Sequence, residues 1–197
     1  MQSFELDKTD LSKLRKAIEG DDQELSSILA EYHASEIAIL FDNIKAEDRQ
    51  RIINLLEIEK ASEVIAEMSE EAHPEELLIQ LHPEKRTEIV EELDYDDATD
   101  IISQLEAHEQ HEILEDLSKD DAESIRNLLS YHEETAGGLM NTQMIKVNIN
   151  LTKKDAIDQI IQQSEEIEEF YTVFVVDDDN IFKGIVSLKD IIKAKGN

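Results

Sequence analysis

Three short acidic segments carry the side chains best suited to binding a cation. They are "KASEV" with Glu63, "DYDDATD" with Asp96, Asp97 and Asp100, and "SKDDAE" with Asp120, Asp121 and Glu123. Magnesium prefers oxygen ligands, keeps several waters and commonly takes one or two carboxylates from any one surface. Asp96 and Asp100 are four residues apart, which places them on one face of a helix. Two such charges ~4 Å apart repel by about 4 kcal/mol at an effective dielectric of 20, so a divalent ion between them would be stabilising. For any one of these carboxylates, a solvated place in a first helical turn is the simpler interpretation.

The overall charge restricts the classes of partner. The 197 residues include 48 Asp and Glu against 19 Lys and Arg, which gives a formal net charge of -29. Such a surface repels a phosphate backbone, so we expect no nucleic acid and favour cationic partners. The hydrophobic share of 40% still allows a chain of this length to bury a core.

The sequence has no cysteine, and therefore no disulfide framework, thiolate metal site or cysteine nucleophile. The opening residues "MQSFELDKTDL" lack a basic segment followed by an apolar one, and no apolar run approaches the ~18 residues that cross a bilayer. We therefore expect a soluble chain in a reducing cytoplasm.

Motifs for catalysis are missing. His108 and His111 in "HEQH" depart from the spacing of H-E-x-x-H, and "DYDDATD" lacks the glycine and the final glutamate of an EF-hand loop. Neither a phosphate-binding G-x-x-x-x-G-K-[ST] loop nor a G-x-S-x-G elbow occurs. The sequence thus predicts that the protein is not an enzyme.

The elements that position the carboxylates follow a repeat. Apolar anchors recur every 12 residues, with a single step of 13 at "EEAHPEE": Ile44, Leu56, Met68, Leu81, Leu93, Leu105, Leu117 and Leu129. This period predicts stacked short helices, with Asp94 and the pair Ser118 and Asp121 as caps, and with Pro74 and Pro83 in first turns. Helices of about 8 to 9 residues are unstable in isolation, so they must pack into an α-solenoid or superhelix. We expect this domain over residues 1–131, beginning with a long helix or helix pair interrupted near "EGDD".

The pattern changes after the glycines of "ETAGGLM". "MIKVNIN", "TVFVVD" and "IFKGIVS" have strand character, while "TKKDAIDQIIQQSEE" and "LKDIIKA" have helical character. In the first of these helices we expect Ala156, Ile157, Ile160 and Ile161 to face inward. The fold class is therefore mainly α, with a small α/β module of order β-α-β-β-α over residues 144–197.

Two motifs resemble known families. The ending G-h-x-S-x-x-D, at residues 184–190, is similar to that of a CBS module. The acidic short-helix repeat followed by "ETAGGLM" resembles the amino-terminal region of the MgtE magnesium transporter family, and the joint resemblance spans nearly the whole chain.

The family resemblance implies a function and a location. It implies a cytosolic magnesium-sensing region on the cytoplasmic side of the cell membrane, joined to a transmembrane pore domain of the same full-length chain and dimeric through its CBS domains. Mg2+ bound between acidic faces would hold a closed arrangement, and its loss would let like charges push the domains apart and free the pore to open. Glu63, Asp96 and Asp100 match positions at which the family's amino-terminal domains contact regulatory magnesium, whereas Asp120 and Asp121 do not.

The CBS resemblance also implies a second ligand, an adenine nucleotide such as ATP or AMP. Asp190 would bond the ribose, with Ser187 and Lys189 beside it. Thr172 stands where nucleotide-binding relatives have a stacking aromatic residue, Lys189 replaces a phosphate-binding arginine, and one CBS repeat is half of the usual pair. We expect weak nucleotide binding at best, and a cap of the last helix is the simpler interpretation of Ser187 and Asp190.

Residues 132–143 join the two regions. Gly137 and Gly138 can take positive φ and allow a close backbone approach. The family resemblance makes this junction a hinge, while an ordinary helix C-cap is the alternative. Two rival functions remain open, a nucleotide-sensing CBS regulator and a helical scaffold resembling the flagellar motor switch proteins.

Overall fold

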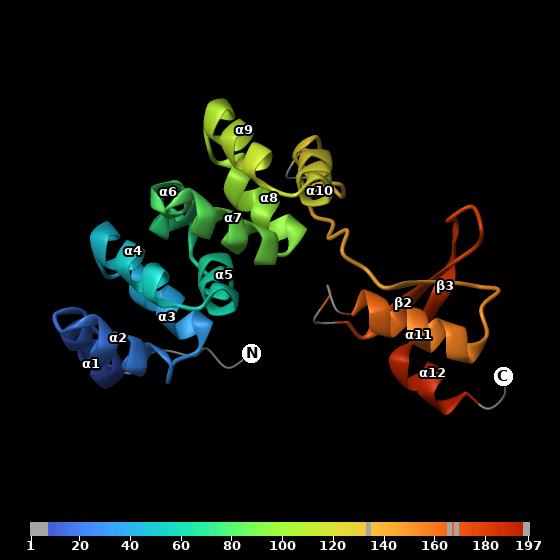
Figure 1. Ribbon diagram of the computed structural model, residues 1–197, viewed down its shortest axis with the longest axis horizontal. Helices are drawn as coiled ribbons and strands as arrows, with labels where there is room; N and C mark the ends of the chain where they lie inside the picture. Colours follow the sequence, from blue (N-terminus) through green and yellow to red (C-terminus); the bar gives the residue numbers. More distant parts are fainter. Residues whose placement is uncertain (1–7, 133–134, 165–166, 168–169, 195–197) are drawn as a thin grey trace. The chain divides into compact units, whose positions relative to one another are not determined.

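The computed structural model describes residues 8–132, 135–164, 167 and 170–194. It divides into two compact units, Met1–Met140 and Asn141–Asn197 (Figure 1). This division falls inside the predicted junction of residues 132–143.

The first unit is built from short helices joined by tight turns (Figure 1). They are α1 (Lys8–Ile18), α2 (Asp22–Leu29), α3 (Ala34–Phe41), α4 (Ala46–Leu55), α5 (Ile58–Ala66), the 3-10 turn η1 (Glu70–Ala72), α6 (Pro74–Gln80), α7 (Pro83–Glu92), α8 (Tyr95–Ser103), α9 (Ala107–Asp116) and α10 (Lys119–Leu129). The predicted opening segment is the pair α1 and α2, separated at "EGDD".

The 12-residue period of the sequence is the period of these helices. α3, α4 and α5 start at residues 34, 46 and 58, and α7 to α10 start at residues 83, 95, 107 and 119. The apolar anchors end the helices: Leu56, Leu81, Leu93 and Leu117 are buried C-cap residues with extended backbone. Each anchor thus turns the chain while its side chain enters the core.

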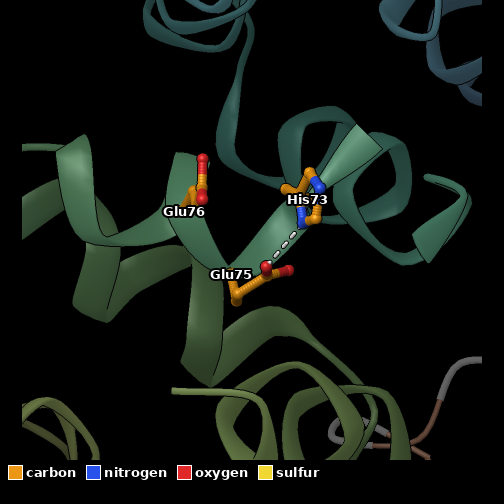
Figure 2. Close-up of side chains that lie close together, drawn as sticks. All are labelled: His73, Glu75 and Glu76. Atoms are coloured by element: carbon orange, nitrogen blue, oxygen red, sulfur yellow. Dashed lines mark hydrogen bonds and ion pairs between the residues drawn. The ribbon is translucent and has the colours of Figure 1, made fainter. Parts of the chain in front are cut away.

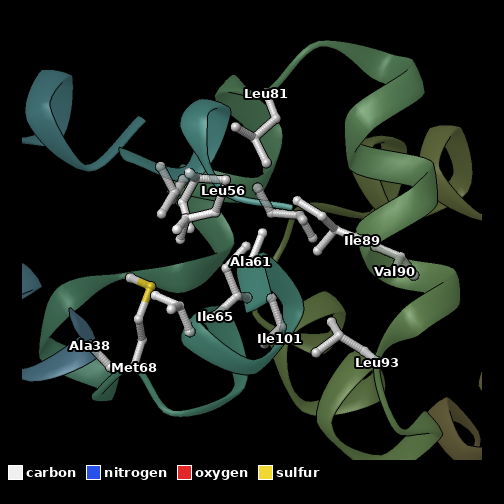
Figure 3. Close-up of a cluster of buried hydrophobic side chains, with 14 of the residues drawn as sticks. Ala38, Leu56, Ala61, Ile65, Met68, Leu81, Ile89, Val90, Leu93 and Ile101 are labelled. Atoms are coloured by element: carbon white, nitrogen blue, oxygen red, sulfur yellow. The ribbon is translucent and has the colours of Figure 1, made fainter. Parts of the chain in front are cut away.

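The helices pack mainly against the helix two places along the chain. α5 lies against α3 and α7, while α8 lies against α6 and α10. Figure 3 shows the shared core around α5 and α7, where Ile65 and Ile89 are enclosed by anchors such as Leu56 and Leu93. This alternation of two stacks produces the predicted superhelix, because no helix could bury its apolar face alone.

Basic side chains close many of the helix ends. Lys60 of α5 donates to Leu29 O and Tyr32 O after α2 (2.9 and 2.6 Å). Lys85 of α7 does the same for Leu56 O after α4 (2.8 Å). The carbonyl end of a helix attracts cations, so these lysines stabilise the helix ends inside the superhelix.

The 13-residue step of the repeat has a visible cause. His73 lies between η1 and α6 in the left-handed backbone region (φ 54°). Pro74 follows it as the first residue of α6, and Pro83 opens α7, as predicted. The extra residue therefore resets the direction of the chain between two units of the repeat.

The second unit has the predicted order β-α-β-β-α. Its elements are β1 (Lys146–Asn148), α11 (Lys153–Gln163), β2 (Thr172–Val176), β3 (Phe182–Ser187) and α12 (Leu188–Lys193). The sheet order is β1-β2-β3, with β1 parallel and β3 antiparallel to β2. On the outer side of β1, Gln163 pairs with both the N–H and the C=O of Lys146 (3.0 and 2.8 Å) and so occupies part of an open sheet edge.

The core of this unit is small. It consists of Ile145, Val147, Ile160, Val173 and Ile191, with Ala156 and Ile157 packed against it. The prediction that Ile161 faces inward is wrong, because this side chain is 57% exposed. An 11-residue helix on a three-stranded sheet covers the sheet with one narrow stripe, and Ile161 lies just outside it.

Candidate cation site

The predicted carboxylates lie on two helices of the first unit. Glu63 is exposed on α5, Asp96 lies in the first turn of α8, and Asp100 lies one turn further along that helix. Asp96 is half-buried and Asp100 is exposed. A first helical turn favours negative charge through the helix dipole, which is why aspartates are stable there. Asp94 is the N-cap residue as predicted, but its side chain makes no cap hydrogen bond.

The carboxyl of Asp97 shows how strongly acidic this surface is. Partial burial raises the pKa of Asp97 to about 6, and the neighbouring charges of Asp96, Asp94, Asp100 and Glu67 add to the rise. Glu67 is the C-cap residue of α5, so the end of α5 and the start of α8 contribute to one acidic surface. We call Glu67, Asp94, Asp96, Asp97 and Asp100 the acidic face.

Glu67 was not predicted as a site residue, and Asp97 was named among the clustered carboxylates without being assigned a role at the site. Glu67 lies one helical turn after Glu63, and Asp97 lies directly between the predicted ligands in the sequence. The i, i+4 spacing of Glu63 and Glu67 is a signal that could have indicated Glu67. The approach of α5 to α8 is a tertiary contact, and residue spacing along one helix cannot predict it.

One oxygen of Asp96 is buried without a partner. Among the residues that the structure describes, nothing forms a hydrogen bond with Asp96 Oδ1. Buried carboxylate oxygens are normally paired, because an unpaired one loses its hydration without compensation. A donor set of carboxylates with an unpaired oxygen is chemically suited to a hard cation such as Mg2+.

The predicted residues are not gathered into one cage. Within the described part of the chain, Glu63, Asp96 and Asp100 do not bring ligand atoms within 4.8 Å of one another as a set of three. The group that does is His73, Glu75 and Glu76 between η1 and α6 (Figure 2). There the His73 ring lies 3.0 Å from Glu75 Oε1, on an exposed corner of the superhelix.

The third acidic segment has a structural role. Ser118 and Asp121 form the predicted cap of α10, since Asp121 N donates to Ser118 Oγ (3.3 Å). Asp121 also accepts a hydrogen bond from Tyr95 Oη at 2.8 Å, which ties the start of α10 to the start of α8. Asp120 and Glu123, by contrast, are exposed on α10.

The residues predicted for a nucleotide form a helix cap. Asp190 N donates to Ser187 Oγ (3.1 Å), and Ser187 Oγ donates to Asp190 Oδ2 (2.7 Å), at the start of α12. Lys189 is exposed between them. The capping alternative is thus present, while the nucleotide role stays a prediction.

The junction glycine Gly137 serves close packing. Its φ lies outside the left-handed range that favours glycine. A Cβ at this position would lie 2.6 Å from Tyr131 Cγ, which only a glycine avoids. The backbone N–H of Gly138 donates to Thr135 Oγ1 at 3.3 Å. Whether the junction acts as a hinge stays a prediction.

Comparison with known proteins identifies both units. A family model described as the MgtE intracellular N domain matches residues 32–134, and a CBS domain model matches residues 136–197. The chain belongs to the MgtE family.

Individual relatives agree with this assignment. The chain is 31% identical over 178 residues to the magnesium transporter MgtE of Thermus thermophilus, an alignment that covers 89% of this chain and 40% of that protein. It is similar to the crystal structure of the cytosolic domain of the Mg2+ channel MgtE in complex with ATP, with a TM-score of 0.85, 31% identity and coverage of 94% of this chain and 76% of that one. The crystal structure of the soluble part of a magnesium transporter has the same fold, with 24% identity and a TM-score of 0.80. The match covers 95% of this chain and 74% of that structure's chain.

The chain therefore corresponds to the cytosolic domain of an MgtE magnesium transporter or channel, and spans two fifths of the length of the Thermus protein. The related proteins are transporters and channels, not enzymes. In the described residues, no helix is both long enough and apolar enough to cross a bilayer.

Proposed function

We propose that this region senses magnesium for an MgtE transporter, with Mg2+ bound on the surface that carries Glu63, Asp96 and Asp100. Ion binding favours a closed arrangement of the protein, and ion loss favours an open one. The transmembrane pore domain of the full-length chain is the partner that responds, and the sensing region lies on the cytoplasmic side of the membrane.

The buried, unpartnered Oδ1 of Asp96 is the observation that carries this proposal. It belongs to the acidic face, where partial burial raises the pKa of Asp97 to about 6 and the neighbouring carboxylate charges add to the rise. A cation relieves both costs, because it supplies a partner for the oxygen and reduces the repulsion between the carboxylates.

The spread of the carboxylates favours a hydrated ion over a caged one. Mg2+ retains several waters and needs only one or two carboxylates from one surface. Glu63, Asp96 and Asp100 are separate enough to contribute in this way, leaving the remaining positions of the ion to water or to another acidic surface. In the family that other surface belongs to the CBS domains of a dimer, and we propose the same here.

The mechanism is a shift between two populations. The ion changes the balance only through its different affinity for the closed and open arrangements. With the ion bound, two acidic surfaces can lie near each other. When the ion leaves, their repulsion favours separation, and residues 132–143 are the segment proposed to bend.

The experiment compares thermal unfolding in Mg2+ with unfolding in Na+ at equal ionic strength. At about 1 to 10 times the dissociation constant, a weak regulatory site adds about 0.4 to 1.4 kcal/mol to stability. The double substitution Asp96→Asn and Asp100→Asn should abolish that difference. The control, Asp120→Asn with Glu123→Gln on α10, removes the same charge from exposed positions and should keep it.

Equal loss in both double variants would mean that Mg2+ only screens an acidic surface, and the specific site would be wrong. X-ray scattering adds an independent readout, since Mg2+ should reduce the radius of gyration of the unaltered protein more than Na+ does. No difference between the two ions in either measurement would exclude magnesium sensing by this region.

ATP is a second candidate ligand. The similar cytosolic domain of the Mg2+ channel MgtE was solved in complex with ATP, and Ser187, Lys189 and Asp190 belong to the CBS-like ending of this chain. Calorimetric titration of ATP and AMP should give weak binding that Lys189→Ala reduces. We recommend Lys189 for this test because Asp190 also caps α12.

A further inference from the structure

A groove of about 230 Å³ lies between α8 and the end of α10, within the first unit. One wall is formed by Thr99, Asp100 and Ser103 of α8 and by its C-cap residue Gln104. The opposite side is formed by Leu128, Leu129, Tyr131, His132 and Gly138. Pockets for drug-sized ligands hold roughly 300–1,000 Å³, so this groove suits a smaller molecule.

The polar wall of the groove offers acceptors. Thr99 Oγ1 donates its hydrogen to Tyr95 O (2.6 Å), and Ser103 Oγ donates to Asp100 O (2.8 Å). With their hydrogens committed to their own helix, both hydroxyls have only lone pairs left for a ligand, and Ser103 Oγ already accepts from Gln104 Nε2 at 3.4 Å. The exposed carboxylate of Asp100 adds a negative charge. These acceptors and the carboxylate favour a ligand that brings donors and a positive charge.

The opposite side of the groove is mainly apolar, apart from the imidazole of His132. Leu128 is 2% exposed, Leu129 is half-buried, and the Tyr131 ring is held beside the backbone of Gly137. A hydrated metal ion gains nothing from such a surface, since it would have to give up water for hydrocarbon. A methylene chain gains free energy there by burying apolar area.

We propose that this groove binds a linear alkyl diamine. One ammonium group pairs with Asp100 and donates to the hydroxyl oxygens of Thr99 or Ser103, while the methylene chain lies along Leu128, Leu129 and Tyr131. The second ammonium reaches the open, acidic surface outside. This ligand is distinct from the Mg2+ of the proposed function, and the two compete because both use Asp100.

Nuclear Overhauser effects (NOEs) in the intact 197-residue protein test this proposal, with 1,4-diaminobutane as the probe. We expect contacts from the ligand methylenes to the methyl groups of Leu128 and Leu129 and to the Tyr131 ring. Such contacts distinguish binding in the groove from nonspecific electrostatic attraction, which a protein of net charge -29 exerts on any cation.

Two substitutions identify the site. Ser103→Phe fills the groove without removing a charge, and Asp100→Asn removes the charged partner, so each should weaken diamine binding by about tenfold. Asp120→Asn on α10 is the charge-matched control and should leave the affinity within about twofold, as expected for an exposed position. Absence of the methyl and ring contacts, or equal weakening by Asp120→Asn, would overturn the proposal.

The same variants keep this inference separate from magnesium sensing. Ser103→Phe retains every carboxylate of the acidic face, so the Mg2+-dependent melting shift should persist in it. If Ser103→Phe loses the NOE contacts of the diamine but keeps the Mg2+-dependent melting shift, the result supports diamine binding in the groove. A preserved Mg2+ shift together with unchanged diamine contacts in Ser103→Phe refutes the groove and leaves the magnesium proposal untouched.

Discussion

The two units of this chain differ in how completely they bury their apolar residues. In the superhelix, the inner helices such as α5 and α8 are covered by helices on either side, and large side chains such as Phe41, Ile65 and Ile102 are almost fully buried. In the α/β unit, Phe182 and Ile185 of β3 remain 60% and 64% exposed. A repeat completes its own core by stacking, whereas a single CBS module leaves apolar surface for another element to cover.

The largest expected effect comes from opening a cavity in the superhelix. Ile65→Ala in α5 should reduce the free energy of unfolding by about 2–5 kcal/mol, because the packed neighbours from α3 and α7 cannot collapse into the space. Ile161→Ala in α11 is the contrasting variant, since this isoleucine is exposed, and should change stability by less than about 0.5 kcal/mol. Denaturant unfolding followed by circular dichroism measures both, and similar losses would contradict the contrast drawn between the two cores.

The sequence predicted the superhelix well because its information is local and repeated. An anchor such as Leu93 ends its helix, enters the core and recurs after 12 residues, so one unit describes the next. The α/β unit was predicted in its order of elements, but Ile161 was misplaced because burial on a small sheet depends on the few residues that the sheet can cover.

The site was predicted only in part. The positions of Asp96 and Asp100 on one helix follow from their spacing, and the roles of Glu63, Asp96 and Asp100 came from the family resemblance. Glu67 joins the acidic face from the end of α5, whereas the other members come from α8 and its N-cap. Residue spacing within one helix does not predict which other helix lies beside it. The packing of Gly137 against Tyr131 likewise depends on a side chain six residues away.

A second prediction concerns the basic residues that the superhelix uses internally. Lys60→Met removes the hydrogen bonds to Leu29 O and Tyr32 O and leaves two carbonyls at the end of α2 without this donor. Hydrogen bonds from a charged group contribute about 1.5–3 kcal/mol, so we expect a loss of about that size. Lys119→Met, at an exposed position of α10, removes the same charge and should have little effect. If both variants lost equal stability, net charge and not helix capping would explain the result.

A smaller effect is expected in the α/β unit from the cap of α12. Ser187→Ala removes the hydroxyl that accepts from Asp190 N and should cost about 0.5–2 kcal/mol. Lys189→Ala, between these two residues and exposed, should be nearly neutral for folding. Thermal unfolding separates the two variants, and a Ser187→Ala protein as stable as the original would show that the cap contributes nothing to this unit.

The smallest effect concerns Asp97 and depends on pH. Because the pKa of Asp97 is raised to about 6 in the folded protein, the folded state holds this proton more tightly than the unfolded chain does. Its contribution to stability is therefore most favourable at low pH and is lost as pH rises from about 4 through 6. Asp97→Asn should remove that dependence and stabilise the protein at pH 7 by less than about 1 kcal/mol, a modest figure because the side chain is partly solvated. Comparing unfolding free energies at pH 5 and pH 7 provides the measurement, with Asp120→Asn as the exposed control on α10. The gain in Asp97→Asn should be larger at pH 7 than at pH 5, and a gain independent of pH would mean that Asp97 is not the group whose charge the acidic face opposes.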